Sequence, residues 1–369
     1  MILKSLSLTD FKNIESAQLE LSPKINCFLG DNGMGKSNLL DALYYISLCR
    51  SFTGAPDQML VRRDAQFATI RGAFERKGLD EDVSIAIRPG LRKVIRRSGK
   101  PYKRLAEHLG VFPVVLLSPA DMDLSAGEPA ERRRFIDQII AQRDNRYYDS
   151  LMRYNSALEQ RNKMLRDESD DNALYEILEM QLESAAEYIC NSRRENIAEL
   201  QAIFEPYFNT ISNCEEIAGL TYESAPYNTA GLAEHLSQTR YRDKILHHTS
   251  AGPHRDDIAF TINGMPVRRS ASQGQTKTFT TALRFAQYEL LRKSLGIRPL
   301  LLLDDIYDKL DAGRVERIIK LVSTSDTFGQ IFITDTNRRH LDETVACMPT
   351  GSDYAIWSVE NGIFSPIAK

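Results

Sequence analysis

The sequence predicts an α/β fold divided into two lobes, one built around a mixed β-sheet and one largely helical. Three observations support this fold class: short apolar segments separated by turn residues up to residue 118, apolar residues at helical spacing from Glu128 onward, and a strand–helix–strand pattern near the C-terminus. We therefore expect the sheet lobe to comprise residues 1–118 and 297–369, and the helical lobe to comprise residues 119–296.

The composition is that of an ordinary globular chain. The 369 residues are 42% hydrophobic and 26% charged and carry a formal net charge of −3, values that exclude a disordered chain, a collagen-like repeat and a disulfide scaffold. The five cysteines are scattered and form no C-x-x-C pair, which favours a reducing compartment. Because no apolar segment suits a signal peptide or a membrane span, we expect a cytoplasmic protein without a membrane partner.

Short apolar patterns predict the strands of the sheet lobe. Leucines at strand-like spacing in residues 3–8 and 19–21 predict an N-terminal hairpin. The apolar segment Ile25–Leu29 ends at a glycine and is followed by helical spacing over Ser37–Leu48. Further strands are expected at Phe67–Phe74, at Val83–Ile87 and, buried on both faces, at Val111–Leu117.

The helical lobe is predicted from apolar residues three or four positions apart. This spacing runs through two long segments, one reaching Leu158 and one from Leu174 toward Phe204, with the polar turn Asp167–Asn172 between them. We expect two long helices folded back on each other. The pattern leaves open whether this hairpin is a functional arm or only part of the packing of the lobe.

Two further signals lie nearer the C-terminus. Asn263-Gly264 separates apolar positions at 258–262 and 265–267 and predicts a tight hairpin, because this dipeptide accepts the positive φ angles of the turn. A strand–helix–strand pattern then predicts a parallel sheet. Its strands are Leu300–Leu303 and Gln330–Thr334, and its helix is Ala312–Thr324.

A loop with the pattern G-x-x-x-x-G-K-S follows the strand at 25–29 and precedes the helix at 37–48. Such a loop turns backbone N–H groups toward phosphate oxygens at a helix N-terminus. We expect Lys36 to reach the β- and γ-phosphates of ATP and Ser37 to bind Mg²⁺. The candidate nucleotide-binding residues are Gly30, Asp31, Asn32, Gly33, Met34, Gly35, Lys36, Ser37 and Asn38. The strand and helix around the loop disfavour the alternative, a glycine-rich turn without function.

The apolar segment Leu300–Leu303 ends in two carboxylates. Asp304 is placed to hold Mg²⁺, and Asp305 is placed to orient or deprotonate the attacking water. Together with Lys36, these are the candidate catalytic residues. The alternative is a core strand that merely ends in a turn, which the loop at 30–37 disfavours.

The spacing of these two motifs narrows the class of ATPase. GTPases and small P-loop kinases keep them close, whereas more than 250 residues separate them here, and no N-K-x-D guanine reader is found. This layout is typical of the two-lobed heads of ATP-binding-cassette (ABC) ATPases. Three weaker elements occur in the order that such heads require. They are Lys12-Asn13 near the nucleotide, the signature-like residues Ser272, Gly274 and Gln275 before a helical stretch, and Asp311 at the position of the dimer-contacting D-loop.

Several segments together resemble the RecF family of bacterial DNA replication and repair proteins over about residues 1–340. They are Phe11-Lys12-Asn13, Gly30–Ser37, Ser118–Leu124, Gly127–Asp137, Gly252–Asp257, Ser272–Gln275 and Leu302–Asp311. The most specific are Gly-Pro-His-Arg-Asp-Asp at 252–257 and Ser-Gln-Gly-Gln at 272–275. The family resembles the heads of chromosome-maintenance ATPases but lacks their long coiled coils.

The resemblance implies an ATP-dependent DNA clamp of recombinational repair. Two copies would close on two ATP molecules, each held between Lys36 of one copy and Ser272 of the other. The homodimer would bind double-stranded DNA and gap junctions, and single strands more weakly. It would assist RecR and RecO in loading RecA, supporting replication restart and the SOS response. A weak, DNA-stimulated ATPase activity would act as a switch that resets the clamp.

The sequence departs from the ABC pattern in three places. Cassette ATPases usually have Glu at the position of Asp305, and the RecF family shares the shorter Asp. The switch histidine expected after the last strand is missing, which leaves Thr334, Asp335 and Thr336 as alternatives. No glutamine loop is identifiable near Ser118. All three departures favour slow hydrolysis.

Charge is distributed unevenly along the chain. Residues 88–104 contain eight basic side chains and no acid, a density that neutralises phosphates without reading sequence. The candidate DNA-binding residues are Arg92, Lys93, Arg96, Arg97 and Lys100; a merely solvated face is the alternative, and Arg132-Arg133-Arg134 is a second candidate. Residues 159–187, with three basic and nine acidic side chains, are a candidate docking surface for a protein. The net charge of −3 therefore does not exclude a DNA-binding protein.

Two other functions are weighed against this one. An ABC-type ATPase serving another partner, such as a transporter subunit, would show a switch histidine and a glutamine loop. An ATP-linked nuclease would need a separate metal-binding carboxylate cluster. The segment His254-Arg255-Asp256-Asp257 is better explained as a structural loop, or as a loop near the nucleotide or DNA.

Overall fold

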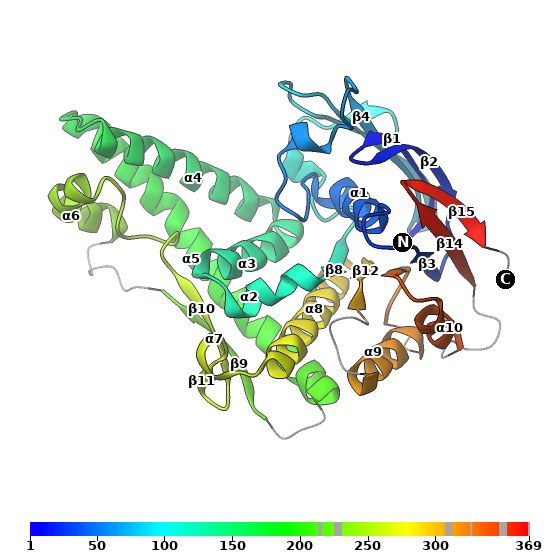
Figure 1. Cartoon of the computed structure of the whole chain (residues 1–369). Coiled ribbons are helices and arrows are strands. Elements are labelled where there is room, and N and C mark those ends of the chain that lie inside the picture. Colours follow the sequence, from blue (N-terminus) through cyan, green and yellow to red (C-terminus); the bar gives the residue numbers. More distant parts are fainter. Residues whose placement is uncertain (213–215, 225–230, 307–311, 325–326, 347–352, 368–369) are drawn as a thin grey trace. The chain divides into compact units, whose positions relative to one another are not determined.

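The computed structural model of the chain describes residues 1–212, 216–224, 231–306, 312–324, 327–346 and 353–367 (Figure 1). The chain forms two compact units. The first consists of Met1–Asp121, Thr210–Asn213 and Thr280–Lys369, and the second of Met122–Asn209 and Cys214–Phe279. The division into lobes at residues 118 and 297 stays a prediction.

The first unit contains a six-stranded antiparallel sheet with the order β2-β1-β4-β5-β6-β7. Its strands are β1 (Ile2–Phe11), β2 (Ile14–Glu20), β4 (Ala68–Arg76), β5 (Leu79–Ile87), β6 (Val94–Arg97) and β7 (Lys100–Pro101). The pairing of β1 with β2 confirms the predicted N-terminal hairpin. Buried apolar residues alternate with more exposed ones along β1, β4 and β5, so this sheet has one apolar and one polar face.

A second six-stranded sheet of the first unit has the order β15-β14-β3-β13-β12-β8. Its strands are β3 (Ile25–Leu29), β8 (Val114–Leu117), β12 (Leu300–Asp304), β13 (Ile331–Asp335), β14 (Tyr354–Glu360) and β15 (Ile363–Ile367). The parallel pairing of β12 with β13 confirms the predicted parallel sheet. Because β8, β12, β13 and β3 are all parallel, their carboxyl ends meet at one edge of the sheet.

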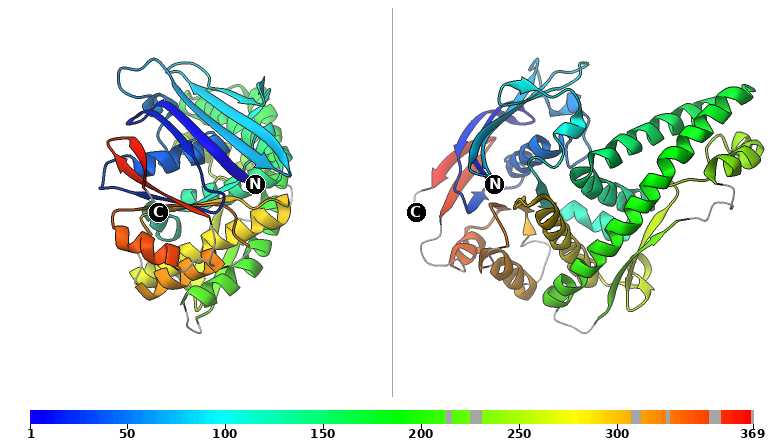
Figure 2. Two further views of the ribbon diagram at one scale, coloured as in Figure 1. Left: turned by 90° about the vertical axis from the view of Figure 1, so that its right-hand side faces the viewer. Right: turned by 180° about the vertical axis from the view of Figure 1, so that it is seen from behind.

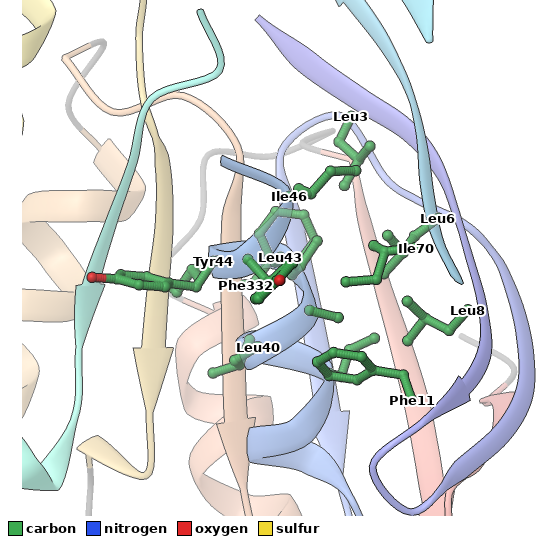
Figure 3. Packing of buried hydrophobic residues seen from close by; sticks show 14 of the residues in the cluster. Leu3, Leu6, Leu8, Phe11, Leu40, Leu43, Tyr44, Ile46, Ile70 and Phe332 are labelled. Carbon is green, nitrogen blue, oxygen red and sulfur yellow. The ribbon is translucent and has the colours of Figure 1, made fainter. Parts of the chain in front are cut away.

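Helix α1 (Lys36–Leu48) contacts strands of both sheets and is buried along most of its length. Figure 3 shows Leu40, Leu43 and Ile46 of α1 among residues of β1, β4 and β13. Helices α9 (Ala312–Thr324) and α10 (Arg338–Ala346) follow β12 and β13. The helix at the phosphate loop is therefore fixed on both sides by apolar packing.

The second unit is mainly helical (Figure 2). Its helices are α2 (Met122–Ala126), α3 (Pro129–Arg143), α4 (Asn145–Arg166), α5 (Asn172–Ser212), α6 (Leu232–Leu246), α7 (Val267–Ser270) and the beginning of α8 (Gln273–Leu295). Helices α4 and α5 run antiparallel, because Asp144 before α4 accepts a hydrogen bond from Tyr188 whereas Arg161 near the end of α4 pairs with Glu179. This confirms the predicted helical hairpin.

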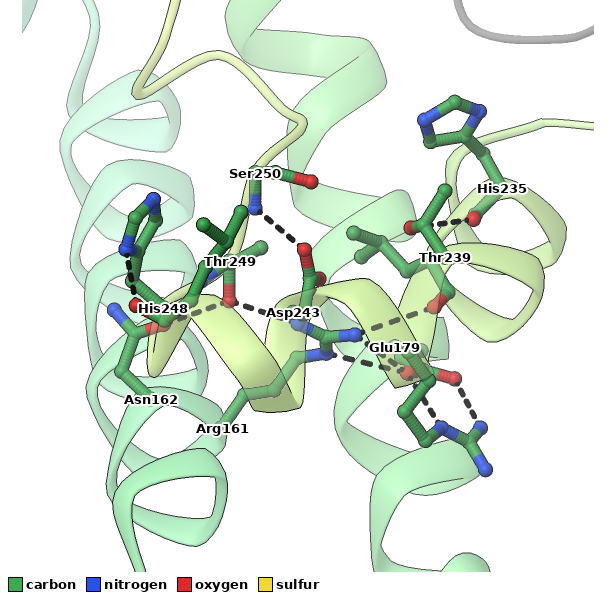
Figure 4. A network of polar contacts seen from close by, with 12 residues as sticks. Arg161, Asn162, Glu179, His235, Thr239, Asp243, His248, Thr249 and Ser250 are labelled. Carbon is green, nitrogen blue, oxygen red and sulfur yellow. Dashed lines mark hydrogen bonds and ion pairs between the residues drawn. The ribbon is translucent and has the colours of Figure 1, made fainter.

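A fully buried arginine ties α6 to this hairpin (Figure 4). The guanidinium of Arg161 donates to Glu179 at 3.0 Å, to Asp243 at 2.7 Å, to the Thr249 hydroxyl at 2.9 Å and to the Leu236 carbonyl at 3.3 Å. A buried charge needs this many acceptors, since its desolvation is costly. The network holds α4, α5 and α6 in one arrangement.

The predicted hairpin at Asn263-Gly264 is confirmed, with β10 (Asp257–Ile262) antiparallel to β11 (Met265–Pro266). Asn263 and Gly264 have φ angles of 51° and 77°. The expectation that Val267 continues the second strand is wrong, because Val267 begins α7. The longer partner of β10 is β9 (Ala218–Glu223), which the sequence pattern did not reveal.

Candidate functional site

The phosphate loop lies between β3 and α1, as predicted. Gly33 and Gly35 adopt φ angles of 83° and 113°, a backbone region that glycine enters without strain. The ammonium group of Lys36 is buried within the loop, where it donates to the Gly30 carbonyl at 2.7 Å and to the Asp31 carbonyl at 3.1 Å. A phosphate oxygen entering the loop would replace these weak acceptors with a charged one.

Ser37 and Asp304 lie side by side, as the two motifs predict. The Ser37 hydroxyl donates to Asp304 Oδ1 at 3.0 Å, and the Thr334 hydroxyl donates to the same oxygen at 2.7 Å. Burial of the carboxyl raises the pKa of Asp304, while the hydrogen bonds from Thr334 and Ser37 and the charge of Lys36 oppose this shift. A buried carboxylate beside a hydroxyl is a donor set that suits Mg²⁺.

Asp305 and the three alternative switch residues follow the ends of β12 and β13. Asp305 has a φ of 45°, and its backbone N–H donates to the Thr334 hydroxyl at 3.1 Å. The Thr334 hydroxyl therefore contacts the carboxylate of Asp304, the last residue of β12, and the backbone of Asp305, the residue that follows it. Asp335 faces His340 of α10, with 3.1 Å between Oδ2 and Nδ1, and Thr336 follows it in the chain. His340 was not predicted, because it lies five residues beyond the expected position of a switch histidine.

Asp121 is a further acidic residue near the carboxyl ends of β8 and β12, and it was not predicted as a site residue. Its carboxylate accepts from the backbone N–H of Ser118, just after β8, at 2.8 Å and from Arg284 of α8 at 2.5 Å. The charge of Asp121 also helps to raise the pKa of Asp304, although less than burial does. The segment after Ser118, where a glutamine loop is expected in an ABC ATPase, thus contains an ion pair between Asp121 and Arg284.

Lys12 and Asn13 lie at the start of α1. The Lys12 ammonium is 2.5 Å from the carboxylate of the fully buried Asp41, so an internal partner holds it. Asn13 accepts a hydrogen bond from Asn38 at 2.8 Å, and its side chain is 3.0 Å from where a Cβ on Gly35 would stand. Asn13 therefore lies directly against the phosphate loop, and Lys12 is tied to α1.

The C-terminal hairpin supports the other side of the loop, which sequence spacing did not predict. The N–H of Gly362, in the turn between β14 and β15, donates to the Met34 carbonyl at 2.8 Å. A Cβ on Gly30 would stand 2.3 Å from the Val359 carbonyl oxygen of β14. The first loop position therefore requires glycine for close packing. The Asn361-Gly362 dipeptide was the available signal for this turn.

The signature-like segment begins α8 in the second unit. Ser272 Oγ accepts from the Gln275 N–H at 3.2 Å, and the Gln275 side chain accepts from the Ser272 N–H at 2.8 Å. This reciprocal cap leaves Ser272 exposed at a helix N-terminus, with Gly274 in the first turn of the helix. Such an end suits an anion. Asp311 lies outside the described residues.

The five DNA-binding candidates divide into two groups. Lys93 is half-buried, with its ammonium 3.0 Å from Asp57 and 3.0 Å from the Tyr45 hydroxyl, and Arg97 pairs with Glu81 at 2.9 Å. The other three, Arg92, Arg96 and Lys100, are exposed, and none of their side chains forms a hydrogen bond or ion pair with a residue that the structure describes. Lys93 and Arg97 thus have internal partners, whereas Arg92, Arg96 and Lys100 present free charges.

The Gly-Pro-His-Arg-Asp-Asp segment is packed within the second unit. His254 accepts from or donates to Tyr154 at 2.6 Å, and burial lowers the pKa of His254 to about 4. Asp257 receives two hydrogen bonds of 2.8 Å from Arg132 of α3. Among the described residues, no cluster of three His, Cys, Asp or Glu side chains could hold a metal ion. These contacts favour the structural-loop interpretation.

None of the described helices combines the length and the apolar character needed to cross a membrane. The model of the RecF/RecN/SMC N-terminal domain matches residues 2–352. The curated protein "DNA replication and repair protein RecF" of Parabacteroides distasonis is 47% identical over 369 residues, covering 100% of both chains. The protein of the same name from Bacteroides fragilis is 44% identical and covers 100% of this chain and 99% of its own length.

Solved structures agree with these sequence relatives. A structure described as the recombination mediator protein RecF-ATP in the RecFOR pathway matches with a TM-score of 0.87 and 29% identity, covering 100% of this chain and 98% of that chain. An Smc head domain from Pyrococcus furiosus matches with a TM-score of 0.57 and 18% identity over 99% of this chain, which shows a shared fold. The predicted fold class, an α/β ABC-type P-loop ATPase head, is confirmed. The chain belongs to the RecF family, within the wider RecF/RecN/SMC group.

Proposed function

We propose that this protein is an ATP-dependent DNA-binding protein of recombinational repair, with ATP hydrolysis as a slow switch. The observation that carries the proposal is the assembly of Lys36, Ser37 and Asp304 at one sheet edge. Three features support it further: the buried ammonium in the loop, the carboxylate beside the hydroxyl, and the ATP named in the description of a RecF structure 29% identical to this chain.

Each residue of the edge has a role in this proposal. Lys36 would stabilise the β- and γ-phosphates, and the backbone of Gly30–Ser37 would bind them through N–H groups. Ser37 and Asp304 fit Mg²⁺, which would neutralise phosphate charge when bound. Asp305 would orient the attacking water, while Thr334 fixes the position of Asp304. The shorter reach of Asp305, compared with the usual Glu, supports slow hydrolysis.

The partners follow from the family and from the signature-like helix end. We infer that two copies close on two ATP molecules, with Ser272, Gly274 and Gln275 of one copy facing the nucleotide held by Lys36 of the other, and Asp311 near the dimer contact. The first and second units would act as the two lobes. The closed dimer would bind duplex DNA and gap junctions and, with RecR and RecO, help to load RecA during replication restart and the SOS response. A reducing, cytoplasmic setting fits the three buried cysteines in the described part of the chain, none of which forms a disulfide there.

A transporter ATPase and an ATP-linked nuclease are less well supported. The edge where a transporter ATPase would show a glutamine loop instead has the Asp121–Arg284 ion pair. A nuclease would need a metal cluster, and three of the candidate residues at 254–257 are engaged: Asp257 with α3, His254 with α4 and Asp256 with α5. Neither alternative explains why the curated relatives that match the whole chain bear a DNA repair name.

The test is DNA binding with and without ATP in rising salt, for the wild type and Lys36→Arg. We expect the wild type to bind a labelled duplex at least tenfold more tightly with ATP than without it. Lys36→Arg should lose most of this gain, because a guanidinium does not fit the space inside the loop. Fluorescence anisotropy measures the affinity.

The matched control is Lys77→Arg at the exposed turn between β4 and β5, which makes the same chemical change outside the loop. It should leave both ATP and DNA binding unchanged. DNA binding that is independent of ATP, or no binding at all, would contradict the proposed function.

A further inference from the structure

The polar face of the antiparallel sheet in the first unit contains a hollow of about 390 Å³. Its lining includes Ser5, Ser7, Arg71, Ser84, Arg96 and Gly99. The opposite face of the same strands supplies Leu6, Ile70, Val83 and Ile85 to the core. Strand alternation therefore directs the serines and arginines away from the core.

Four of these residues form a single row across the sheet. Ser7 of β1 is opposite Arg71 of β4, Arg71 is opposite Ser84 of β5, and Ser84 is opposite Arg96 of β6. We call this set the Ser–Arg row. Neighbouring strands are about 4.8 Å apart, so the backbones of the two arginines lie about 10 Å from each other. Gln18 of β2 extends the row beyond Ser7.

The two arginines of the row are free to bind a ligand. Both are exposed, and the side chain of neither forms a hydrogen bond or an ion pair with any residue in the described parts of the chain. The neighbouring Arg97 and Arg76, by contrast, share the carboxylate of Glu81. The hollow is also lined by one acid, Asp82, which lies opposite Ala73 rather than in the row. The row itself therefore carries two unpaired positive charges.

The chemistry of the row suits a phosphodiester backbone. Guanidinium groups bind phosphate oxygens in a fork, and serine hydroxyls add short hydrogen bonds to the same oxygens. No aromatic side chain is among the residues that line the hollow, so base stacking, the usual means of holding single strands, is not offered there. A duplex presents its phosphates outward and needs no stacking.

We propose that the Ser–Arg row binds the backbone of double-stranded DNA. The proposal rests on the proposed function, because it names the surface that a DNA-binding protein of this family would use. It adds Arg71 and the serines of β1 and β5 to the contact, none of which belongs to the basic segment 88–104. It also predicts that Lys93 and Arg97, which have internal partners, contribute little.

The test uses Arg71→Ala, Arg96→Ala and the double variant, with a labelled duplex, saturating ATP and a salt series. Each single variant should weaken binding several-fold for any duplex sequence, and the double variant at least tenfold. The slope of log affinity against log salt should fall by about one for each arginine removed. The double lysine variant, Arg71→Lys with Arg96→Lys, should bind the duplex more tightly than the double alanine variant and less tightly than the wild type. Neither the affinity for ATP nor the Tm should change in any of these variants.

The control is Arg339→Ala on α10, which removes one exposed arginine from another part of the first unit. If the wild type binds DNA with ATP, full duplex binding by the double variant or an equal loss of binding in Arg339→Ala would overturn the proposal. A larger loss of affinity for single strands than for the duplex in the double variant would also overturn it. So would displacement of the duplex by inorganic phosphate at constant ionic strength. Absence of DNA binding in the wild type would instead overturn the proposed function.

Discussion

At the scale of single residues, the site contains a carboxyl group whose burial opposes its ionisation. Asp304 is 5% exposed and its pKa is raised by burial, although Thr334 and Ser37 donate to it. The unfolded chain ionises Asp304 at a lower pH than the folded chain does. Stability is therefore lost as pH rises through the interval between the two pKa values. Such a cost is common where a site is arranged for a ligand that is itself positively charged.

This cost can be measured with Asp304→Asn. The Asn Oδ1 can still accept from Thr334 and Ser37, but it carries no charge. We expect the variant to be more stable than the wild type by about 1 kcal/mol at pH 8, with a difference that shrinks as pH falls, and to lose Mg²⁺-dependent ATPase activity. Urea unfolding between about pH 3 and pH 8 gives the free energies, because the difference disappears only as pH falls to the ordinary Asp pKa of about 3.9. Asp64→Asn, at an exposed loop position, should behave as the wild type. A variant that is less stable at pH 8 would refute the explanation.

At the scale of elements, the C-terminal hairpin packs directly against the phosphate loop. Its turn has Asn361 and Gly362 at φ angles of 49° and 80°, and the turn between β4 and β5 has Lys77 and Gly78 at 54° and 77°. The two turns differ in their surroundings. A Cβ on Gly362 would stand 2.6 Å from the Asn13 carbonyl oxygen, whereas a Cβ on Gly78 would meet nothing within 4 Å.

This difference makes Gly78→Ala a matched control for Gly362→Ala. Gly78→Ala should lose about 1 kcal/mol of stability, because alanine is strained at positive φ. Gly362→Ala should lose more than this, because its Cβ would also clash with the Asn13 carbonyl oxygen. Only Gly362→Ala should also weaken ATP binding, by about tenfold, since its backbone must shift and release the Met34 carbonyl of the phosphate loop. Thermal unfolding and titration with a fluorescent ATP analogue separate the two effects. Equal ATP affinity in the two variants would show that the hairpin does not support the loop.

Most elements with a local signal could be predicted from the sequence, and those without one could not. The hairpin at 263–264, the parallel pairing of β12 with β13 and the long helices follow from periods and turn residues. The pairing of β14 with β3 does not, because more than 320 residues separate the two strands in the chain. The buried partners of Arg161 could not be predicted either. Helix α6 is mostly polar, and its position depends on tertiary contacts such as the one between Asp243 and Arg161.

The residues of the candidate site also divide into those that the sequence predicted and those that it did not. Lys36, Ser37 and Asp304 were predicted because each belongs to a motif whose spacing reflects its chemistry. Asp121 and His340 were not, because the order of the strands, rather than the order of the sequence, brings them to the edge. For Lys12, spacing gave the location but not the partner, which is a buried aspartate one turn into α1.

At the scale of the whole molecule, helix α8 connects the two units covalently. It begins in the second unit with the cap formed by Ser272 and Gln275, and in the first unit its Arg284 pairs with Asp121 beside the nucleotide edge. One helix therefore links the signature-like end to the residues that surround Asp304. An ATP molecule that binds to Ser272 of a second copy would act on both units through this helix.

The shared-site dimer predicts a sharp effect of Ser272→Arg. The bulky arginine side chain at this exposed helix end would keep away the γ-phosphate of the ATP bound to the second copy. Lys36 of the same chain would still bind its own ATP. We expect the wild type to double from 41.8 kDa when ATP is added and the variant to remain at that mass, with ATP affinity within about twofold of the wild type. Multi-angle light scattering measures the mass, and a fluorescent ATP analogue measures the affinity.

Two controls separate this effect from damage to the helix cap. Ser272→Thr keeps the oxygen that accepts from the Gln275 N–H and should retain ATP-dependent dimerisation, because a lost cap alone costs only about 1 kcal/mol. Gln160→Arg adds the same cation on an exposed position of α4 and should dimerise normally. If Ser272→Arg also dimerises with ATP, the nucleotide is not shared between the two copies. The end of α8 would then be a helix cap and nothing more.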